Sequence, residues 1–411
     1  MIKFIEFDNF KCLSGKQFNL NRINIFTGYN GRGKSSVIQA ILLLFQSVRN
    51  GETESFRNLH LNGDFVQLGD FEELLTDIER YDFTLKFCIS NSSDHKVELG
   101  YKMSDDIKVG KLCHCVIDSE DFFDSPGSIL SAKINNIHET STTSEKELKQ
   151  LPSYLFEQFS NVKLHYVAAN RQGPVKFVEK QEIPKYYKVG SDGSMTINTL
   201  ATYKESIPPK MNLNPDDNNE HDLNSSVSSW IDYIMNGGNV NINGNDKSID
   251  NKSGISKSAI LELNFGFGSN DRTYKSYNVG FGYSYILPIV VTALIAKMND
   301  IVIIENPEAH LHPEAQTRLT FLLAKLASSG VQVFVETHSE HVINGIRLAS
   351  LKKDYELSNE DVRIFFFDNN FQKIDLTIEN NGRIKNWPER FFDQYQKELA
   401  EILKLSAGLF T

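Results

Sequence analysis

The segment Gly28-Tyr29-Asn30-Gly31-Arg32-Gly33-Lys34-Ser35 constrains this chain more than any other feature of its sequence. It follows a short apolar run, Ile23 to Phe26, and precedes residues that are apolar at helical spacing as far as Val48. The order strand, glycine-rich turn, helix is the setting in which G-x-x-x-x-G-K-[ST] binds a phosphate with backbone N–H groups and a helix N-terminus. A glycine-rich turn without a ligand is the alternative, and the flanking elements argue against it.

This interpretation assigns roles to the residues of the loop. Lys34 is expected to reach the β- and γ-phosphates of a nucleoside triphosphate, and the Ser35 hydroxyl is expected to bind Mg²⁺. The expected cofactors are therefore ATP and Mg²⁺. The other candidate nucleotide contacts in this segment are Asn30, Gly31, Gly33 and Ser36.

An acidic motif follows a second apolar run much later in the chain. Residues 301–304 are Ile-Val-Ile-Ile, and the next four are Glu305-Asn306-Pro307-Glu308. A buried strand that ends in a carboxylate is how a Walker B acid reaches a Mg²⁺ ion, so Glu305 is a candidate metal ligand. The alternative is a buried strand followed by an acidic helix start.

Three further parts of the chain contain candidates for the same site. His338 follows the apolar run Val331 to Val335, and a histidine at a strand end beside the γ-phosphate can hydrogen-bond it; a purely structural histidine is the alternative. The glycine-rich segment Asn278–Ser284, with Gly280 and Ser284, opens a predicted helix and either addresses a phosphate on a partner subunit or caps the helix. Gln67 either touches Mg²⁺ or is an ordinary polar loop residue.

Composition excludes several classes of protein. The net charge of −10 argues against a strongly basic nucleic-acid coat, although not against a local basic groove. The four cysteines are too few and too irregularly spaced for a disulfide scaffold, and Cys113-His114-Cys115 lacks the second pair that zinc spacing needs. The N-terminus has no signal-peptide pattern, and the longest apolar stretch, 286–298, is too short for a bilayer. A cytoplasmic protein without a membrane partner is expected.

The order of predicted elements indicates an α/β protein. Strands alternating with helices predict a largely parallel sheet, whereas the alternating segments after Tyr81 predict antiparallel strands. Residues 211–257 are predicted to be mostly loop, with a short helix at 230–235. Other predicted helices are 285–297, with Pro288 in its first turn, 315–328 and 387–405. Four domains are expected: 1–90 (the lobe with the glycine-rich loop), 91–270 (an insertion), 271–350 (the second lobe) and 351–411 (a small C-terminal domain).

Together the motifs resemble the ABC-type ATPase heads shared by SMC proteins, the overcoming-lysogenization-defect (OLD) nucleases and bacterial AAA-like defence ATPases. Residues 305–313 are similar to the ENPEAHLHP element of one prokaryotic branch. Residues 278–288 resemble the degenerate signature of that branch, and residues 386–394 resemble its small C-terminal domain of unknown function. The resemblance is weakest from about 91 to 260.

The resemblance implies a P-loop ABC-type ATPase head with a mostly parallel core sheet, an antiparallel β subdomain and a mixed insertion. It makes Gln67, Gly280 and His338 the Q-loop, signature and switch positions. Such heads dimerise face to face with ATP between one P-loop and the partner's signature. Prokaryotic members often belong to anti-phage systems and work with a nuclease or toxin, so those partners are expected here.

The sequence also departs from the pattern of these ATPases. Asn306 stands where the catalytic base is usual, and an amide cannot accept a proton from water. Glu308 is the candidate substitute, so slow hydrolysis is expected. No acidic cluster long enough for a nuclease follows His338.

The expected function is a slow ATPase subunit that controls a separate effector, with DNA or RNA as a further candidate ligand. The alternatives are an ATP-dependent scaffold with little hydrolysis and an SMC-like DNA-repair ATPase.

Overall fold

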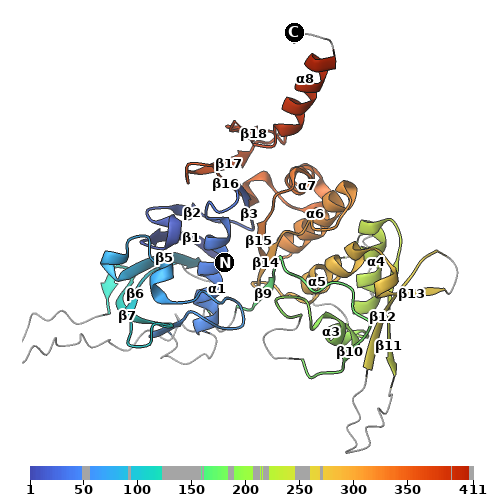
Figure 1. Ribbon diagram of the computed structural model, residues 1–411, viewed down its shortest axis with the longest axis horizontal. Helices are drawn as coiled ribbons and strands as arrows, with labels where there is room; N and C mark the ends of the chain where they lie inside the picture. Colours follow the sequence, from blue (N-terminus) through green and yellow to red (C-terminus); the bar gives the residue numbers. More distant parts are fainter. Residues whose placement is uncertain are drawn as a thin grey trace, which may run out of the picture. The chain divides into compact units, whose positions relative to one another are not determined.

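A computed structural model describes residues 1–48, 56–90, 94–122, 159, 162–183, 189–206, 213, 215, 222–245, 260–268, 272–389 and 391–406 (Figure 1). The chain forms two compact units. The first unit contains residues 1–20 and 35–163, and the second contains residues 21–34 and 164–411. The loop predicted around 135–144 lies outside the described residues.

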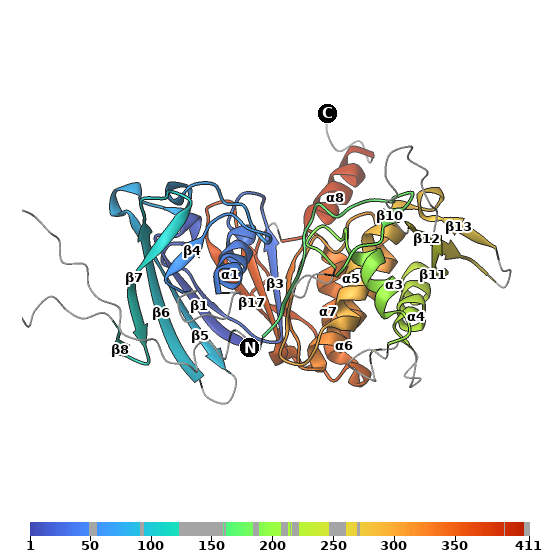
Figure 2. The same cartoon turned by 90° about the horizontal axis from the view of Figure 1, so that it is seen from below.

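The first unit is built on an antiparallel sheet in the order β2-β1-β5-β6-β7-β4, with β8 beside β7. Its helix α1 (Lys34–Val48) and strand β5 are both in contact with Phe159, through Phe45 at 5.3 Å and Phe87 at 5.8 Å between ring centroids. These contacts place α1 against one face of the sheet (Figure 2). The strands are β1 (Ile2–Asp8), β2 (Gln17–Asn19), β4 (Asn58–His60), β5 (Asp82–Ser90), β6 (Asp94–Met103), β7 (Val109–Ile117) and β8 (Glu120–Asp121), and the short 3-10 helices are Lys11–Leu13, Phe71–Leu74 and Ile78–Arg80.

The second unit is built on a mixed sheet in the order β18-β17-β16-β3-β15-β14-β9. The strands from β16 to β9 run parallel, so their carboxyl ends share one edge, while β17 and β18 are antiparallel additions. The parallel strands are short buried runs, as expected when both faces of a sheet are covered. Their bounds are β3 (Ile23–Gly28), β9 (Leu164–Val167), β14 (Ile301–Glu305), β15 (Gln332–Glu336), β16 (Val362–Phe367), β17 (Lys373–Ile378) and β18 (Ile384–Lys385).

Helices pack beside this sheet and join it to a smaller antiparallel sheet. Figure 1 shows α5 (Phe281–Ile295), α6 (Pro313–Ser328) and α7 (Glu340–Leu351) beside the parallel strands. The smaller sheet has the order β10-β12-β11, with β13 beside β12, and α3 (Thr196–Tyr203) and α4 (Leu223–Met235) lie near it. Its strands are β10 (Val178–Glu179), β11 (Asn239–Asn245), β12 (Ile260–Gly266) and β13 (Thr273–Lys275). Within the described residues, no helix is long and apolar enough to cross a membrane.

Three predicted elements were wrong in detail. Helix α5 begins at Phe281, so Pro288 lies in its interior rather than in its first turn, because the glycine-rich turn ends at the N-cap Gly280. Residues 239–245 form β11 rather than loop: only Val240 and Ile242 alternate as apolar residues, and the strand depends on its full register with β12. Helix α8 covers Gln394–Ser406, later than predicted, because the buried Phe391 packs on Phe366 and Trp387.

Candidate functional site

Gly28 is the last residue of β3 and the first residue of the glycine-rich loop, and only glycine fits at this position. A Cβ on Gly28 would lie 2.2 Å from the carbonyl oxygen of Phe367, and Gly28 has φ +118°. The neighbouring Tyr29 N–H donates a 3.0 Å hydrogen bond to that same oxygen. Gly31 and Gly33 also have positive φ, 69° and 113°, which favours glycine. Strand β16 therefore fixes the start of the loop, while Asn30 is exposed on it.

Lys34 is folded back over this loop. Its side chain is buried at 3% exposure, and its Nζ donates hydrogen bonds to the carbonyl oxygens of Gly28 (3.1 Å) and Tyr29 (2.7 Å). Burial lowers the pKa of Lys34, and the nearby Glu336 carboxylate partly opposes that shift. The ammonium group is thus held at the loop, where a phosphate would compete with two backbone carbonyls for its protons.

Glu305 ends β14 at the edge that also carries the loop. Its Oε1 accepts a hydrogen bond from the Tyr166 hydroxyl at 3.0 Å, and its Oε2 accepts one from the Ala169 N–H at 3.2 Å. Burial raises the pKa of Glu305, although both hydrogen bonds and the Arg171 charge act in the opposite direction. The carboxylate is therefore oriented by β9 and the residues that follow it.

Arg171 organises the backbone behind this motif. One of its terminal nitrogens donates to the carbonyls of Ala168 (2.9 Å) and Glu305 (2.6 Å), and the other donates to the carbonyl of Asn306 (2.7 Å). The guanidinium is buried, which lowers its pKa, and it lies 5.5 Å from the ring centroid of Tyr285 on α5. The structure therefore places Arg171 beneath the acidic motif, in contact with the backbone of Glu305 and Asn306.

Asn306 and Glu308 are anchored to the next strand. Asn306 has φ +45°, a conformation that Asn tolerates, and its N–H donates to the Glu336 carbonyl at 2.8 Å. The Glu308 carboxylate accepts hydrogen bonds from the Thr337 hydroxyl (2.8 Å) and the His338 backbone N–H (2.7 Å). The acidic motif and the histidine segment are therefore joined directly through the Glu308 carboxylate.

The His338 imidazole is exposed on one side and in the electrostatic range of both Lys34 and Glu308. Partial desolvation lowers the pKa of His338, Lys34 lowers it further, and Glu308 acts in the opposite direction. Lys34, Glu308 and His338, which are far apart in the chain, therefore meet at the carboxyl edge of β3, β14 and β15.

The other predicted site residues are distributed differently. Gly280 is exposed at the start of α5, whereas Ser284 is only 7% exposed, and within the described residues its hydroxyl has no hydrogen-bond partner. These two residues therefore do not share an exposed surface. Ser35 and Ser36 lie in the first turn of α1, and Gln67 forms an isolated bridge with Asn62; all three belong to the first unit.

Reasoning from the sequence missed Glu336. Its register partner on the parallel neighbour strand is Glu305, so two carboxylates end adjacent strands. Glu336 is 6% exposed and interacts electrostatically with Lys34. The signal is present in the sequence, because Glu336 follows an apolar run just as Glu305 does.

Comparison with known proteins assigns families to two parts of the chain. Residues 127–343 match the family described as AAA ATPase domain. Residues 357–402 match a family described as a protein of unknown function, DUF3696, which confirms the predicted C-terminal domain of unknown function. No curated protein matches the chain.

Several solved structures are similar to the chain. The SMC head domain from Thermotoga maritima is 11% identical, with 92% of this chain and 99% of that chain covered and a TM-score of 0.44. The recombination mediator RecF with ATPγS ("RecF-ATPrS") is 14% identical, with 89% and 95% covered and a TM-score of 0.41. The match to the AAA ATPase domain covers more than half of the residues, and the chain therefore belongs to the AAA ATPase domain family.

Proposed function

We propose that this chain binds Mg-ATP at the loop Gly28–Ser35, hydrolyses it slowly and acts as a nucleotide-controlled switch. The observation that carries this proposal is the position of Lys34, whose buried ammonium group is held at the loop by two backbone carbonyls. A triphosphate offers the same group stronger, charge-assisted hydrogen bonds. Glu308 and His338 lie within electrostatic range of one another, and His338 within that of Lys34, which suits a group that senses the terminal phosphate.

The proposed ligands divide into phosphate contacts and metal contacts. Asn30, Gly31, Gly33 and Ser36 would contact the phosphates together with Lys34. Mg²⁺ prefers oxygen ligands and normally keeps water and phosphate oxygens in its shell. Ser35, Gln67 and Glu305 are the proposed protein contributions to that shell, either directly or through water.

Slow hydrolysis follows from the groups available to accept a proton. Asn306 can orient water through its amide oxygen but cannot act as a base. Glu308 can, but both of its carboxylate oxygens already accept hydrogen bonds from the Thr337–His338 segment. Each oxygen keeps a lone pair for a proton, but protonation weakens both of these charge-assisted hydrogen bonds, so a long-lived ATP state is expected.

We further propose that ATP joins two copies of the chain, as a dimer or a larger assembly. Gly280 is exposed at the start of the long helix α5, and an N-terminus of this kind attracts a partner's phosphate. The proposed output is control of a separate nuclease or toxin in prokaryotic anti-phage defence, in the cytoplasm, with DNA or RNA as a candidate trigger. The second candidate function is an ATP-dependent scaffold that hardly hydrolyses ATP, which Asn306 favours.

Sedimentation velocity with and without Mg-ATP tests the association. The wild type is expected to form a larger species with Mg-ATP, whereas Gly280→Asp, which places a carboxylate against the incoming phosphate, should stay small. Gly244→Asp on β11 is the matched control, because Gly244 is also exposed and a Cβ there makes only an ordinary 3.7 Å contact. An unchanged distribution with ATP, or the same effect from both substitutions, contradicts the proposed assembly.

A further inference from the structure

Glu336 ends β15, the strand that lies between the strand of the glycine-rich loop and the strand of the acidic motif. Its register partners are Phe26 on β3 and Glu305 on β14. Neighbouring strands lie about 4.8 Å apart, and residues in register point to the same face of a sheet. The stacked rings of Phe26 and Phe334, which is two residues before Glu336, identify that face. The side chains of Glu305 and Glu336 therefore leave the same face of the sheet at neighbouring strand ends.

The Glu336 charge acts on both halves of the proposed nucleotide site. Burial lowers the pKa of Lys34, and the Glu336 carboxylate opposes that shift. Burial raises the pKa of Tyr166, which donates a hydrogen bond to Glu305, and the charges of Glu305 and Glu336 raise it further. Glu336 is only 6% exposed, and charges interact more strongly in a protein interior than in water. One buried carboxylate is thus in electrostatic range of the loop lysine and of the tyrosine that orients the candidate metal ligand.

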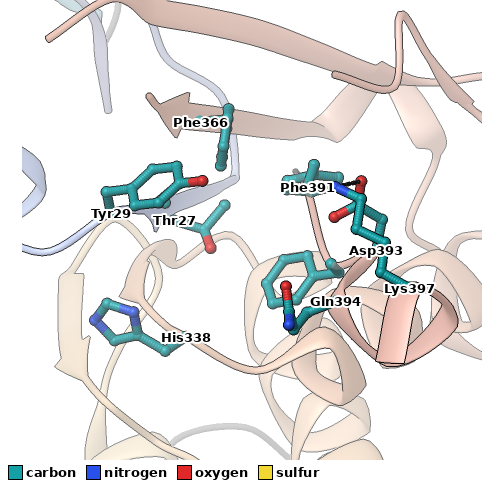
Figure 3. A pocket seen from close by; sticks show the side chains of 10 residues that line it. Thr27, Tyr29, His338, Phe366, Phe391, Asp393, Gln394 and Lys397 are labelled. Atoms are coloured by element: carbon teal, nitrogen blue, oxygen red, sulfur yellow. Dashed lines mark ion pairs between the residues drawn. The ribbon is translucent and has the colours of Figure 1, made fainter. Parts of the chain in front are cut away.

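Glu336 does not line the cavity of about 500 Å³ beside the loop. That cavity is lined by Thr27, Tyr29 and His338, together with residues of the C-terminal segment (Figure 3). The Glu336 side chain is therefore not offered to a ligand in this cavity. Any effect that Glu336 has on a nucleotide at the loop is exerted by its charge, through the interior of the protein.

We propose that Glu336 is a positioning residue that makes nucleotide binding depend on a divalent cation. The proposal rests on the proposed ATP site at Gly28–Ser35. Without nucleotide, the Lys34 ammonium partly offsets the Glu336 charge, and Arg171 partly offsets that of Glu305. A triphosphate recruits the Lys34 ammonium for its own oxygens and brings further negative charge beside two buried carboxylates. The positive charge that this arrangement then lacks is that of a cation such as Mg²⁺, which prefers oxygen ligands.

The charge of Glu336 predicts opposite effects on two kinds of binding. Neutralising the carboxylate removes a repulsion from the phosphates, so nucleotide without a divalent cation should bind more tightly. It also removes an attraction for the cation, so the cation should add less to the affinity. At an effective dielectric constant of about 20, one unit charge roughly 7 Å from another changes an affinity about tenfold or more. A residue that only supported the fold would weaken binding when replaced and would not strengthen it in the absence of the cation.

Calorimetry on the full chain with the slowly hydrolysed analogue AMP-PNP, in excess Mg²⁺ and in EDTA, tests the proposal. In Glu336→Gln the affinity in EDTA should rise about threefold or more, and the ratio of the Mg²⁺ affinity to the EDTA affinity should fall about tenfold or more. Glu336→Asp keeps the charge and should keep this ratio within about threefold of the wild type. Glu379→Gln, at an exposed glutamate of the same unit, is the matched control and should bind like the wild type in both conditions.

A second readout measures the cation rather than the nucleotide. Coupling between two ligands is reciprocal, so Glu336→Gln should lower the affinity of the AMP-PNP complex for Mn²⁺ by a similar factor. Electron paramagnetic resonance of free Mn²⁺ reports this affinity. If the thermal midpoint shows that Glu336→Gln does not fold, Glu336→Leu, which is also neutral, replaces it in both experiments.

The possible results separate this proposal from the proposed function. A ratio in Glu336→Gln equal to that of the wild type overturns the proposal, as does an affinity in EDTA that is unchanged or lower. A ratio in Glu336→Asp as low as that in Glu336→Gln also overturns it, because shape rather than charge would then decide. If the wild type binds AMP-PNP in neither condition, the ATP site fails and this proposal fails with it. If binding depends on Lys34 but not on Glu336, only this proposal fails.

Discussion

Arg171 donates a 2.7 Å hydrogen bond to the carbonyl of Asn306. Asn306 is the second residue of the Glu305–Glu308 motif, and its backbone is left-handed. The same guanidinium also holds the Glu305 carbonyl and lies over Tyr285 of α5. A single buried side chain thus joins the strand end that carries the candidate metal ligand to the helix that carries Gly280.

Arg171→Met should therefore destabilise the protein markedly. Methionine fills much of the same volume but removes the guanidinium donor from the carbonyls of Ala168, Glu305 and Asn306, and of these Asn306 keeps the Ala309 N–H at 3.1 Å. The expected loss in the free energy of unfolding is about 2–4 kcal/mol, measured by urea denaturation. The matched control Arg383→Met, at an exposed arginine, should change it by less than about 0.5 kcal/mol. Equal effects of the two substitutions would show that the buried hydrogen bonds contribute nothing specific.

Glu308→Gln should abolish steady-state ATP turnover while ATP still binds. The glutamine keeps an acceptor for the His338 N–H, and the Thr337 hydroxyl can rotate to accept from the new amide, so the local fold survives. What is lost is the only group in the Glu305–Glu308 motif, other than the proposed metal ligand, that can take a proton. Phosphate release is the measurement, with the exposed Glu401→Gln as the control. Unchanged turnover would mean that Glu308 is not the base.

Asn306→Asp should accelerate hydrolysis. At φ +45° an aspartate is tolerated about as well as the asparagine, whereas longer side chains are strained there. The substitution therefore restores a carboxylate at the usual base position with little structural cost. Single-turnover rates should rise at least several-fold above a wild-type rate well below the ~10 s⁻¹ typical of enzymes. A wild-type rate of hundreds per second, unaffected by Asn306→Asp or Glu308→Gln, would place the catalytic motif elsewhere.

The His338 imidazole should titrate below its usual range in the ligand-free protein, because partial burial and the Lys34 charge both lower its pKa. The folded pKa is then lower than the unfolded one, so the unfolded chain binds more protons in the window just below pH 6.5. In that window His338 makes the free energy of unfolding increase with pH. Imidazole NMR signals assigned with His338→Gln report the value, and Lys34→Ala should raise it. A pKa at or above the usual value in the wild type contradicts this description.

Much of the fold was predictable from the sequence because short apolar runs next to glycine, lysine and glutamate mark strand ends clearly. Those signals located the loop before Lys34, the strand before Glu305 and the strand before His338. The contacts of Arg171 and Tyr166 with Glu305 were not predictable, because they join residues more than 130 positions apart through strand pairing that no local pattern encodes. Strand β11 was missed because asparagines alternate with its few apolar residues, and its pairing with β12 overrides that weak propensity.

Calorimetric titration of Mg-ATP into the wild type and Lys34→Ala tests the central claim, that this loop binds the nucleotide. Removing the ammonium group leaves the β- and γ-phosphates without a charge-assisted donor in a partly desolvated loop. The expected loss is about 1.5–3 kcal/mol, which is at least about tenfold in affinity. Lys404→Ala, at an exposed lysine of α8, should bind ATP like the wild type. Equal affinity of Lys34→Ala and the wild type, with both proteins folded, would contradict the assignment of Gly28–Ser35 as the ATP site.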